Sequence, residues 1–258
     1  MERWCILVTR GAPTMSESTY PVIRQQTLSE VLRRTAARLP DKVAIQCGAV
    51  SWTYVQFDAL VNRVASGLGA RGVIPGTRVA ILSRNSHAFA AMRFAVARLG
   101  AVLVPINFML TCAEVSFILQ HSGASRLCAD SEFAPLAARA AREVGTVHEL
   151  FWLPSREMTP PVAGMTSFAE LTACVEPLSE SVLSSESLAQ ILYTSGTESK
   201  PKGVMHSHGA VLSQYLSCLV DLEIAEADRI LHALPLFHIA QLDVFFGPSV
   251  QVDRKSVV

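Results

Sequence analysis

Short apolar runs alternate with amphipathic stretches through the first half of the chain. The apolar runs, which are typical of buried strands, cover residues 79–82, 102–105 and 126–128. The amphipathic stretches, whose apolar positions follow the period of a helix, cover residues 54–70, 87–99 and 113–121. Because strands that alternate with helices build sheets covered on both faces, this pattern predicts an α/β fold with a parallel sheet.

Further elements are predicted on both sides of this alternating region. Apolar positions on one face predict a helix over residues 27–39, which Pro40 ends, and residues 43–53 predict a hairpin that turns near Gly48. Later in the chain the pattern predicts strands over residues 188–193 and 229–233 and a helix over residues 210–222.

A change in composition suggests how the chain is divided. Residues 154–187 are rich in Pro and Ser, with one short predicted helix at 168–175, and we expect them to connect two α/β lobes. The first lobe would cover residues 27–153, and a second would begin with residues 188–252. Residues 1–26 would then form an N-terminal extension.

The overall composition excludes several classes of protein. Half of the 258 residues are hydrophobic and 17% are charged, which excludes wholesale disorder and low-complexity architectures. Lys plus Arg and Asp plus Glu each number 22, so there is no basic surplus to bind nucleic acid or anionic lipid. No apolar run approaches the roughly 20 residues of a transmembrane helix, and no signal peptide is apparent. The sequence gives no indication of the oligomeric state.

The cysteines favour a reducing compartment. No two of them have the C-x-x-C spacing of a zinc site or a redox pair, so we expect reduced thiols, no metal site and a cytoplasmic protein. The six are Cys5, Cys47, Cys112, Cys128, Cys174 and Cys218.

Two glycine-containing patterns do not have the context that nucleotide binding requires. Residues 67–72 satisfy G-x-G-x-x-G, but they end a helical segment, whereas the dinucleotide fingerprint follows a strand and opens a helix. Gly72 is better interpreted as a left-handed residue that ends the helix. The Walker phosphate-binding loop is excluded as well, because Pro201 stands five residues after Gly196, where that motif requires a second glycine.

A third pattern has the parts needed to hold polyphosphate. Residues 193–204 read YTSGTESKPKGV and lie between a predicted strand and a predicted helix. Gly196 allows close approach of the backbone, the hydroxyl side chains can donate hydrogen bonds, and Lys202 adds a positive charge for the outer phosphates. On composition alone, a solvated surface loop explains the segment about as well. The hydroxyl residues are Thr194, Ser195, Thr197 and Ser199.

Residues 194–202 resemble the phosphate-binding signature of the adenylate-forming (AMP-binding) superfamily, which includes acyl-CoA synthetases, luciferases and nonribosomal adenylation domains. Glu198 and Ser199 stand where the more frequent form of the signature has Thr and Gly. Two other segments agree in order and spacing. Residues 99–107 (LGAVLVPIN) resemble an earlier structural motif of the family, and residues 234–239 (LPLFHI) resemble the motif that follows the signature.

The resemblance assigns roles to particular residues. His238 alone would be a satisfied core histidine more often than a functional group, but its position in the motif implies a gate or an orienting donor near the carboxylate that is activated. Lys202 and His238 are therefore the expected catalytic residues. The resemblance implies nucleotide binding by Thr194, Ser195, Gly196, Thr197, Glu198, Ser199, Lys202 and Gly203.

Three neighbours of the loop receive other interpretations. His206 and His208, together with Ser207, are expected to begin the next helix. Ser195 is not expected to be a nucleophile, because no Asp or His has a motif relation to it.

The resemblance also implies a reaction. A carboxylate attacks the α-phosphorus of ATP to give an acyl-adenylate and pyrophosphate, and a thiol such as that of coenzyme A then displaces AMP. Mg²⁺ would assist with the phosphate charge. The apolar motif surroundings favour a fatty or other hydrophobic acid. The alternatives are an inactive fragment, a weak nucleotide-binding module without turnover, or another member of the superfamily such as an amino-acid adenylation domain.

Both ends of the chain carry expectations of their own. The family has further motifs downstream, so the chain is expected to be an incomplete large N-terminal domain, about the first half of an enzyme. Residues 253–258 lose the apolar pattern and can be encoded by DNA that resembles a sequencing adapter, which predicts an artefactual tail. Residues 1–14 also fit poorly, and Met15 is the expected native start.

Overall fold

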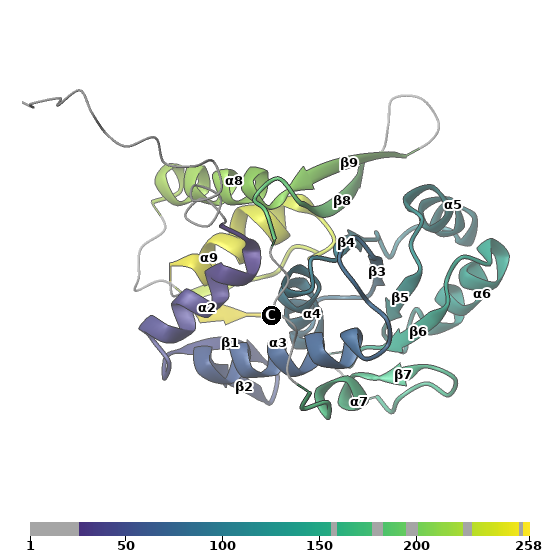
Figure 1. Cartoon of the computed structure of the whole chain (residues 1–258), viewed down its shortest axis with the longest axis horizontal. Coiled ribbons are helices and arrows are strands. Elements are labelled where there is room, and N and C mark those ends of the chain that lie inside the picture. Colours follow the sequence, from purple (N-terminus) through teal and green to yellow (C-terminus); the bar gives the residue numbers. More distant parts are fainter. Residues whose placement is uncertain (1–25, 156–158, 177–182, 195–200, 224–228, 253–254) are drawn as a thin grey trace, which may run out of the picture.

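The alternating region folds into a seven-stranded sheet with the strand order β7-β6-β5-β3-β4-β8-β9 (Figure 1). The computed structural model describes residues 26–155, 159–176, 183–194, 201–223, 229–252 and 255–258. All neighbouring strands of this sheet run parallel except β8 and β9, which form an antiparallel hairpin. The strands are β3 (Arg78–Leu82), β4 (Val102–Pro105), β5 (Arg126–Ala129), β6 (Glu149–Trp152), β7 (Thr166–Ser167), β8 (Leu188–Thr194) and β9 (Lys202–Ser207).

The two faces of this sheet pack against different helices, as the alternation along β3 shows. Val79 and Ile81 join the core that contains α3 (Tyr54–Gly69) and α4 (His87–Arg98). Ala80 and Leu82 point to the opposite face and join the core of α5 (Cys112–Ser122) and α6 (Ala134–Val144). Successive side chains of a strand point to opposite faces, so a run that is apolar at every position requires cover on both.

Local signals fix where several helices begin and end. The side chain of Thr53 accepts from the backbone N–H of Gln56, and Gln56 caps Thr53 in return, which starts α3. Ser86 caps α4 through the backbone N–H of Phe89. Gly123, with φ of 67°, ends α5 in the left-handed conformation that favours glycine.

A second sheet of four strands has the order β10-β11-β1-β2. Strands β1 and β2 form the hairpin expected near Gly48, and β11 runs parallel to both β1 and β10. The helices α2, α8 and α9 lie together on the left of Figure 1, above this sheet. The elements are α2 (Leu28–Arg38), β1 (Val43–Cys47), β2 (Val50–Thr53), α8 (His208–Asp221), β10 (Arg229–Leu231), the π-helix η1 (Ala240–Phe246), α9 (Gly247–Gln251) and β11 (Lys255–Val257).

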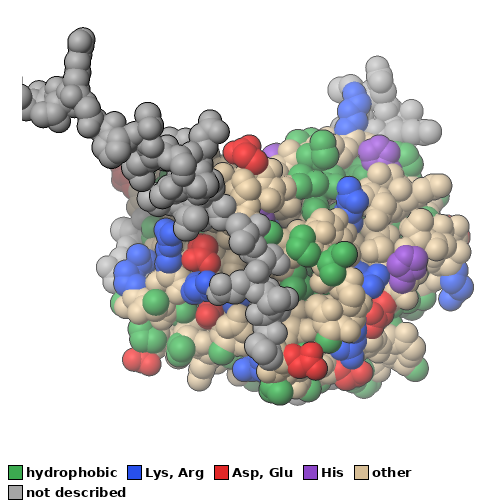
Figure 2. Space-filling view, viewed as in Figure 1, with side chains coloured by type: hydrophobic (Ala, Val, Ile, Leu, Met, Phe, Trp, Pro, Cys, Tyr) green, Lys and Arg blue, Asp and Glu red, His purple; other side chains and the backbone are tan. Residues whose placement is uncertain are grey.

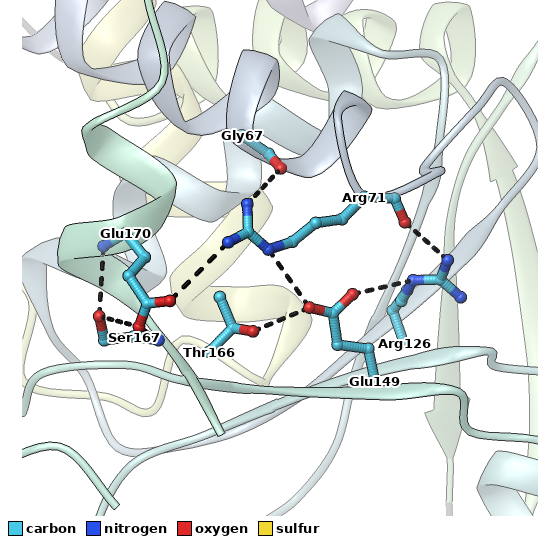
Figure 3. A network of polar contacts seen from close by, with 7 residues as sticks. All are labelled: Gly67, Arg71, Arg126, Glu149, Thr166, Ser167 and Glu170. Atoms are coloured by element: carbon cyan, nitrogen blue, oxygen red, sulfur yellow. Dashed lines mark hydrogen bonds and ion pairs between the residues drawn. The ribbon is translucent and has the colours of Figure 1, made fainter. Parts of the chain in front are cut away.

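A polar network ties the amino ends of β5 and β6 to the end of α3 (Figure 3). The carboxylate of Glu149 forms ion pairs with Arg71 Nε at 3.3 Å and with Arg126 Nε at 3.9 Å. It also accepts a hydrogen bond from the hydroxyl of Thr166 at 2.8 Å. Arg71 also reaches Glu170, which caps the short helix α7 (Phe168–Thr172). These groups lie at the amino edge of the parallel strands. The network links the strands β5, β6 and β7 to the end of α3 and to α7.

Charge is mixed on the face of the molecule that Figure 2 shows. The face in Figure 2 carries basic and acidic side chains interspersed, without a broad area of either sign. This agrees with the net charge of zero.

No helix in the described part of the chain has both the length and the apolar character needed to cross a bilayer.

Most predicted elements are confirmed, but sequence analysis did not predict α6, β6, β7, β9, η1, α9 or β11. The inward positions of α6, Ala134, Ala137, Ala140 and Ala141, are all alanine. Sequence analysis placed the residues of β9 within the loop and the helix start. The short helix expected at 168–175 ends earlier, at Thr172.

One sheet includes strands from both sides of the predicted boundary between the lobes. Strand β8, in the segment that begins at residue 188, pairs with β4 in the seven-stranded sheet. Lys255–Val257, within the expected artefactual tail, forms β11 and pairs with β1 and β10. The domain boundaries and the origin of residues 253–258 stay predictions.

Candidate functional site

A cleft of about 660 Å³ opens at the carboxyl ends of β4 and β8. These strands run parallel, so the residues that follow them meet at the same edge of the sheet, where open α/β folds bind their ligands. All three segments that resemble family motifs contribute to its walls. The lining residues are Pro105 and Asn107 from the first segment, Tyr193, Thr194, Pro201 and Val204 from the second, Phe237, His238 and Ile239 from the third, and Leu110, Glu114, Ile118, Leu192 and His206.

The hairpin of β8 and β9 carries the predicted phosphate loop. Thr194 at the end of β8 pairs with Lys202 at the start of β9, and both side chains are exposed. Lys202 does not line the cleft, whereas Val204 and His206 do. Because alternate residues of a strand point to the same face, Lys202 lies on the same face of β9 as these two residues. Its side chain therefore starts from the cleft face of the hairpin. The predicted site residues Ser195, Gly196, Thr197, Glu198 and Ser199 lie outside the described residues.

Packing alone accounts for the glycine at position 203. Gly203 lies opposite Tyr193 in the hairpin, and a Cβ added there would come within 3.0 Å of Ile191 Cγ2 and 3.1 Å of Tyr193 Cζ. Nucleotide binding by Gly203 stays a prediction.

His238 lies at the cleft with a defined hydrogen-bond pattern. Its Nδ1 accepts from the backbone N–H of Ala240 at 3.2 Å, so the neutral ring carries its proton on Nε2. The side chain is exposed, which leaves Nε2 available as a donor. Next to it, Phe237 packs edge-on against Phe108 with ring centroids 5.1 Å apart. This geometry suits an orienting donor beside an apolar wall.

Two cleft residues were not predicted in these roles. His206, expected to help begin the next helix, is the penultimate residue of β9 and lines the cleft. Ser207 does cap α8, by accepting from Ala210 N, and His208 is the first residue of that helix. The hydroxyl of Tyr193 lies 2.7 Å from Nδ1 of His121, and partial burial raises the pKa of Tyr193. No signal in the sequence pairs His121 with Tyr193.

A buried polar cluster lies beneath the hairpin. Asp243, on η1, accepts from Arg93 Nη2 at 2.9 Å and from Gln190 Nε2 at 2.5 Å. The Tyr215 hydroxyl donates to the same carboxylate at 3.4 Å, and burial raises the pKa of that hydroxyl. Gln190 Nε2 also lies 3.3 Å from Nδ1 of His206. Through Gln190, the cluster connects a buried ion pair to the wall of the cleft.

The glycines of residues 67–72 lie at the end of helix α3, as sequence analysis predicted. Gly72 follows α3 with φ of 77°, and its N–H donates to the carbonyl of Gly69. Gly67 packs on α7, where an added Cβ would lie 2.4 Å from the carbonyl oxygen of Leu171. These glycines serve helix termination and packing.

The profile of AMP-binding enzymes matches residues 32–251, which include all three motif segments. The chain belongs to the AMP-binding enzyme family. Among curated relatives, this AMP-binding chain is 40% identical over 199 residues to the long-chain-fatty-acid–CoA ligase FadD13 of Mycobacterium tuberculosis, covering 75% of this chain and 37% of the relative. It is 33% identical over 228 residues to a feruloyl-CoA synthase of Amycolatopsis, covering 88% of this chain and 43% of the relative.

A solved structure shares the fold of this AMP-binding chain. The inhibitor-bound N-terminal domain of FACL13 from Mycobacterium tuberculosis superposes with a TM-score of 0.80 at 32% identity, covering 91% of this chain and 57% of that one. The chain therefore has the α/β fold of the N-terminal domain of adenylate-forming enzymes. It spans about two fifths of the length of the curated relatives it matches.

Proposed function

We propose that the protein carrying this chain activates a carboxylic acid with ATP and transfers the acyl group to coenzyme A. The observation that carries the proposal is the convergence on one cleft of three segments that are far apart in sequence. The relatives named above are a long-chain-fatty-acid–CoA ligase and a feruloyl-CoA synthase, which supports the same chemistry.

In the first step a carboxylate oxygen bonds to the α-phosphorus of ATP, and the bond between that phosphorus and pyrophosphate breaks. Lys202 would neutralise charge on the departing phosphates, and Thr194 would donate its hydroxyl to a phosphate oxygen. His238 would orient the carboxylate through its Nε2 proton. In the second step the thiol sulfur of coenzyme A bonds to the acyl carbon, and AMP leaves.

The described residues do not supply the ligands of a Mg²⁺ ion. Of the described residues that line the cleft, Glu114 is the single acidic one, and its carboxylate already accepts from the backbone and the hydroxyl of Thr111. No group of three or more His, Cys, Asp or Glu side chains in the described ranges is arranged to hold a metal. Mg²⁺ is an expectation from the family, and no step proposed here depends on it.

The lining of the cleft favours a hydrophobic acid. Leu110, Ile118 and Leu192 form part of the wall together with Val204 and Phe237. An apolar wall binds an aliphatic or aromatic acyl group by removing its surface from water. We therefore favour fatty or aryl acids over amino acids, whose ammonium group would need an acidic partner.

The test is the Lys202→Ala variant of the full-length protein, assayed by acid-dependent exchange of pyrophosphate into ATP. Loss of a charged contact to the transition state costs about 2 to 4 kcal/mol, so we expect the exchange rate to fall roughly 30- to 1,000-fold. Because Lys202 is exposed, the unfolding temperature should stay unchanged.

Lys42→Ala is the matched control, since Lys42 precedes β1 in the other sheet and does not line the cleft. Equal exchange rates in both variants would remove the role assigned to Lys202. Absence of exchange with any acid in the wild-type protein would favour the alternative, a nucleotide-binding module without turnover. We expect no exchange from the 258 residues alone.

A further inference from the structure

The segment that carries Phe237 and His238 is held by side-chain amides. Four backbone groups of this segment, the carbonyls of His232 and Leu234 and the N–H groups of Leu234 and Leu236, bond to side chains. Two amides supply all four of these bonds, Asn85 and Gln241. The conformation of the segment is therefore set by residues outside it.

Asn85 makes three of these bonds. Its Nδ2 donates to the carbonyl of His232 at 3.0 Å and to that of Leu234 at 2.7 Å. Its Oδ1 accepts from the N–H of Leu236 at 2.7 Å. Only one orientation of the amide satisfies two acceptors and a donor at once, so this set of partners requires an asparagine.

The position of Asn85 in the fold suits it to hold the backbone of residues 232–236. It lies between β3 and Ser86, the capping residue of α4, so its backbone is anchored by the sheet and by a helix start. It is separated from Leu236 by 151 positions in the sequence. Asn85 does not line the cleft, whereas Phe237 and His238, next to its partners, do.

We propose that Asn85 is a positioning residue that holds segment 232–236 so that Phe237 and His238 face the cleft. This inference rests on the proposed function for its kinetic consequence, because the two side chains would form the binding site of the acid. When the bonds from Asn85 are lost, the wall that these side chains form loses its fixed position, and the acid binds less tightly.

The test is the isosteric Asn85→Asp variant of the full-length protein. Asp keeps the acceptor for Leu236 but places an oxygen beside the carbonyls of His232 and Leu234, which replaces two attractions with repulsions. We expect KM for the acid to rise at least about tenfold, the effect of one lost hydrogen bond, with a smaller change in KM for ATP. Rates are compared well below the unfolding temperature of each variant.

Asn62→Asp is the matched control. Asn62 Oδ1 accepts from Arg98 Nη1 at 2.6 Å, which an aspartate also does, and Asn62 does not line the cleft. This variant undergoes the same change of side chain and charge, and both KM values should stay at the wild-type level. Wild-type KM values in folded Asn85→Asp, or the same loss in both variants, would overturn the proposal.

A second measurement separates this inference from the proposed function. In Asn85→Ala the amide proton of Leu236 loses its acceptor and should exchange with solvent faster than in the wild type. If the wild-type protein activates no acid, the proposed function fails, and hydrogen exchange still tests the anchoring. Unchanged exchange at Leu236 in Asn85→Ala would overturn the anchoring itself.

Discussion

Replacement of Asp243 by Asn tests whether the buried ion pair holds the core together. Both Arg93 and Asp243 have side chains that are 1% exposed, and the salt-bridging atoms lie 2.9 Å apart. The guanidinium depends on this partner, since its Nε and Nη1 atoms are buried without a hydrogen-bond partner among the described residues. Neutralising Asp243 would leave the buried charge of Arg93 without a countercharge, and the one other hydrogen bond of this guanidinium among the described residues is the long one to Tyr215 at 3.4 Å.

The magnitude follows from the distance. With an effective dielectric constant of about 20, two unit charges 2.9 Å apart attract by roughly 6 kcal/mol. Part of this attraction offsets the cost of removing both charges from water, and loss of one partner of such a pair costs about 3 to 5 kcal/mol. We expect Asp243→Asn and Arg93→Met each to lower the free energy of unfolding by this amount.

The assay is urea unfolding at pH 7.5, followed by tryptophan fluorescence and interpreted only where the slope with urea matches the wild type. The double variant Arg93→Met/Asp243→Asn removes both charges together and should lose less than either single variant. Single losses below about 1 kcal/mol, or a double variant whose loss equals the sum, would refute the reasoning, because both results mean that the charges do not depend on each other.

Two further predictions concern packing and acid sensitivity. Gly247→Ala should lower the free energy of unfolding by about 3 kcal/mol or more, because the new Cβ would lie 1.9 Å from Cζ of buried Tyr215; wild-type stability in a melt would contradict this close packing. Burial lowers the pKa of His208 and of His232 to about 4, so the unfolded chain binds more protons below pH 6.5. Stability should therefore be complete above that pH and fall toward pH 4, by about 2 kcal/mol per histidine at pH 5. Urea titrations across this range should show a smaller fall in His232→Gln than in the wild type.

The residues of the cleft show how far sequence reasoning reached. The three motif segments and His238 were identified through their resemblance to motifs of the adenylate-forming superfamily. His206 was misplaced, because a strand with the exposed, mixed residues of β9 has no apolar alternation and exists through its pairing with β8. Asn85 and Asp243 gave no signal, since their partners are known only once distant segments meet.

The sequence by itself determined the type and order of most strands and helices and several of their boundaries. Strand β3 is apolar at successive positions, and Thr53 with Gln56 starts α3 through contacts three residues apart. Signals of this kind depend on neighbours in the chain, so they are legible without a structure.

Only the tertiary structure decided which strands are neighbours and which side chains meet at the cleft. The pairing of β8 with β4 brings Thr194 and Asn107 to the same cleft, and the amide of Asn85 bonds to a segment about 150 residues away. The buried pair of Arg93 and Asp243 joins α4 to η1 in the same way. Such contacts form when the chain closes long loops to bury its apolar faces, and local pattern does not encode the geometry of that closure.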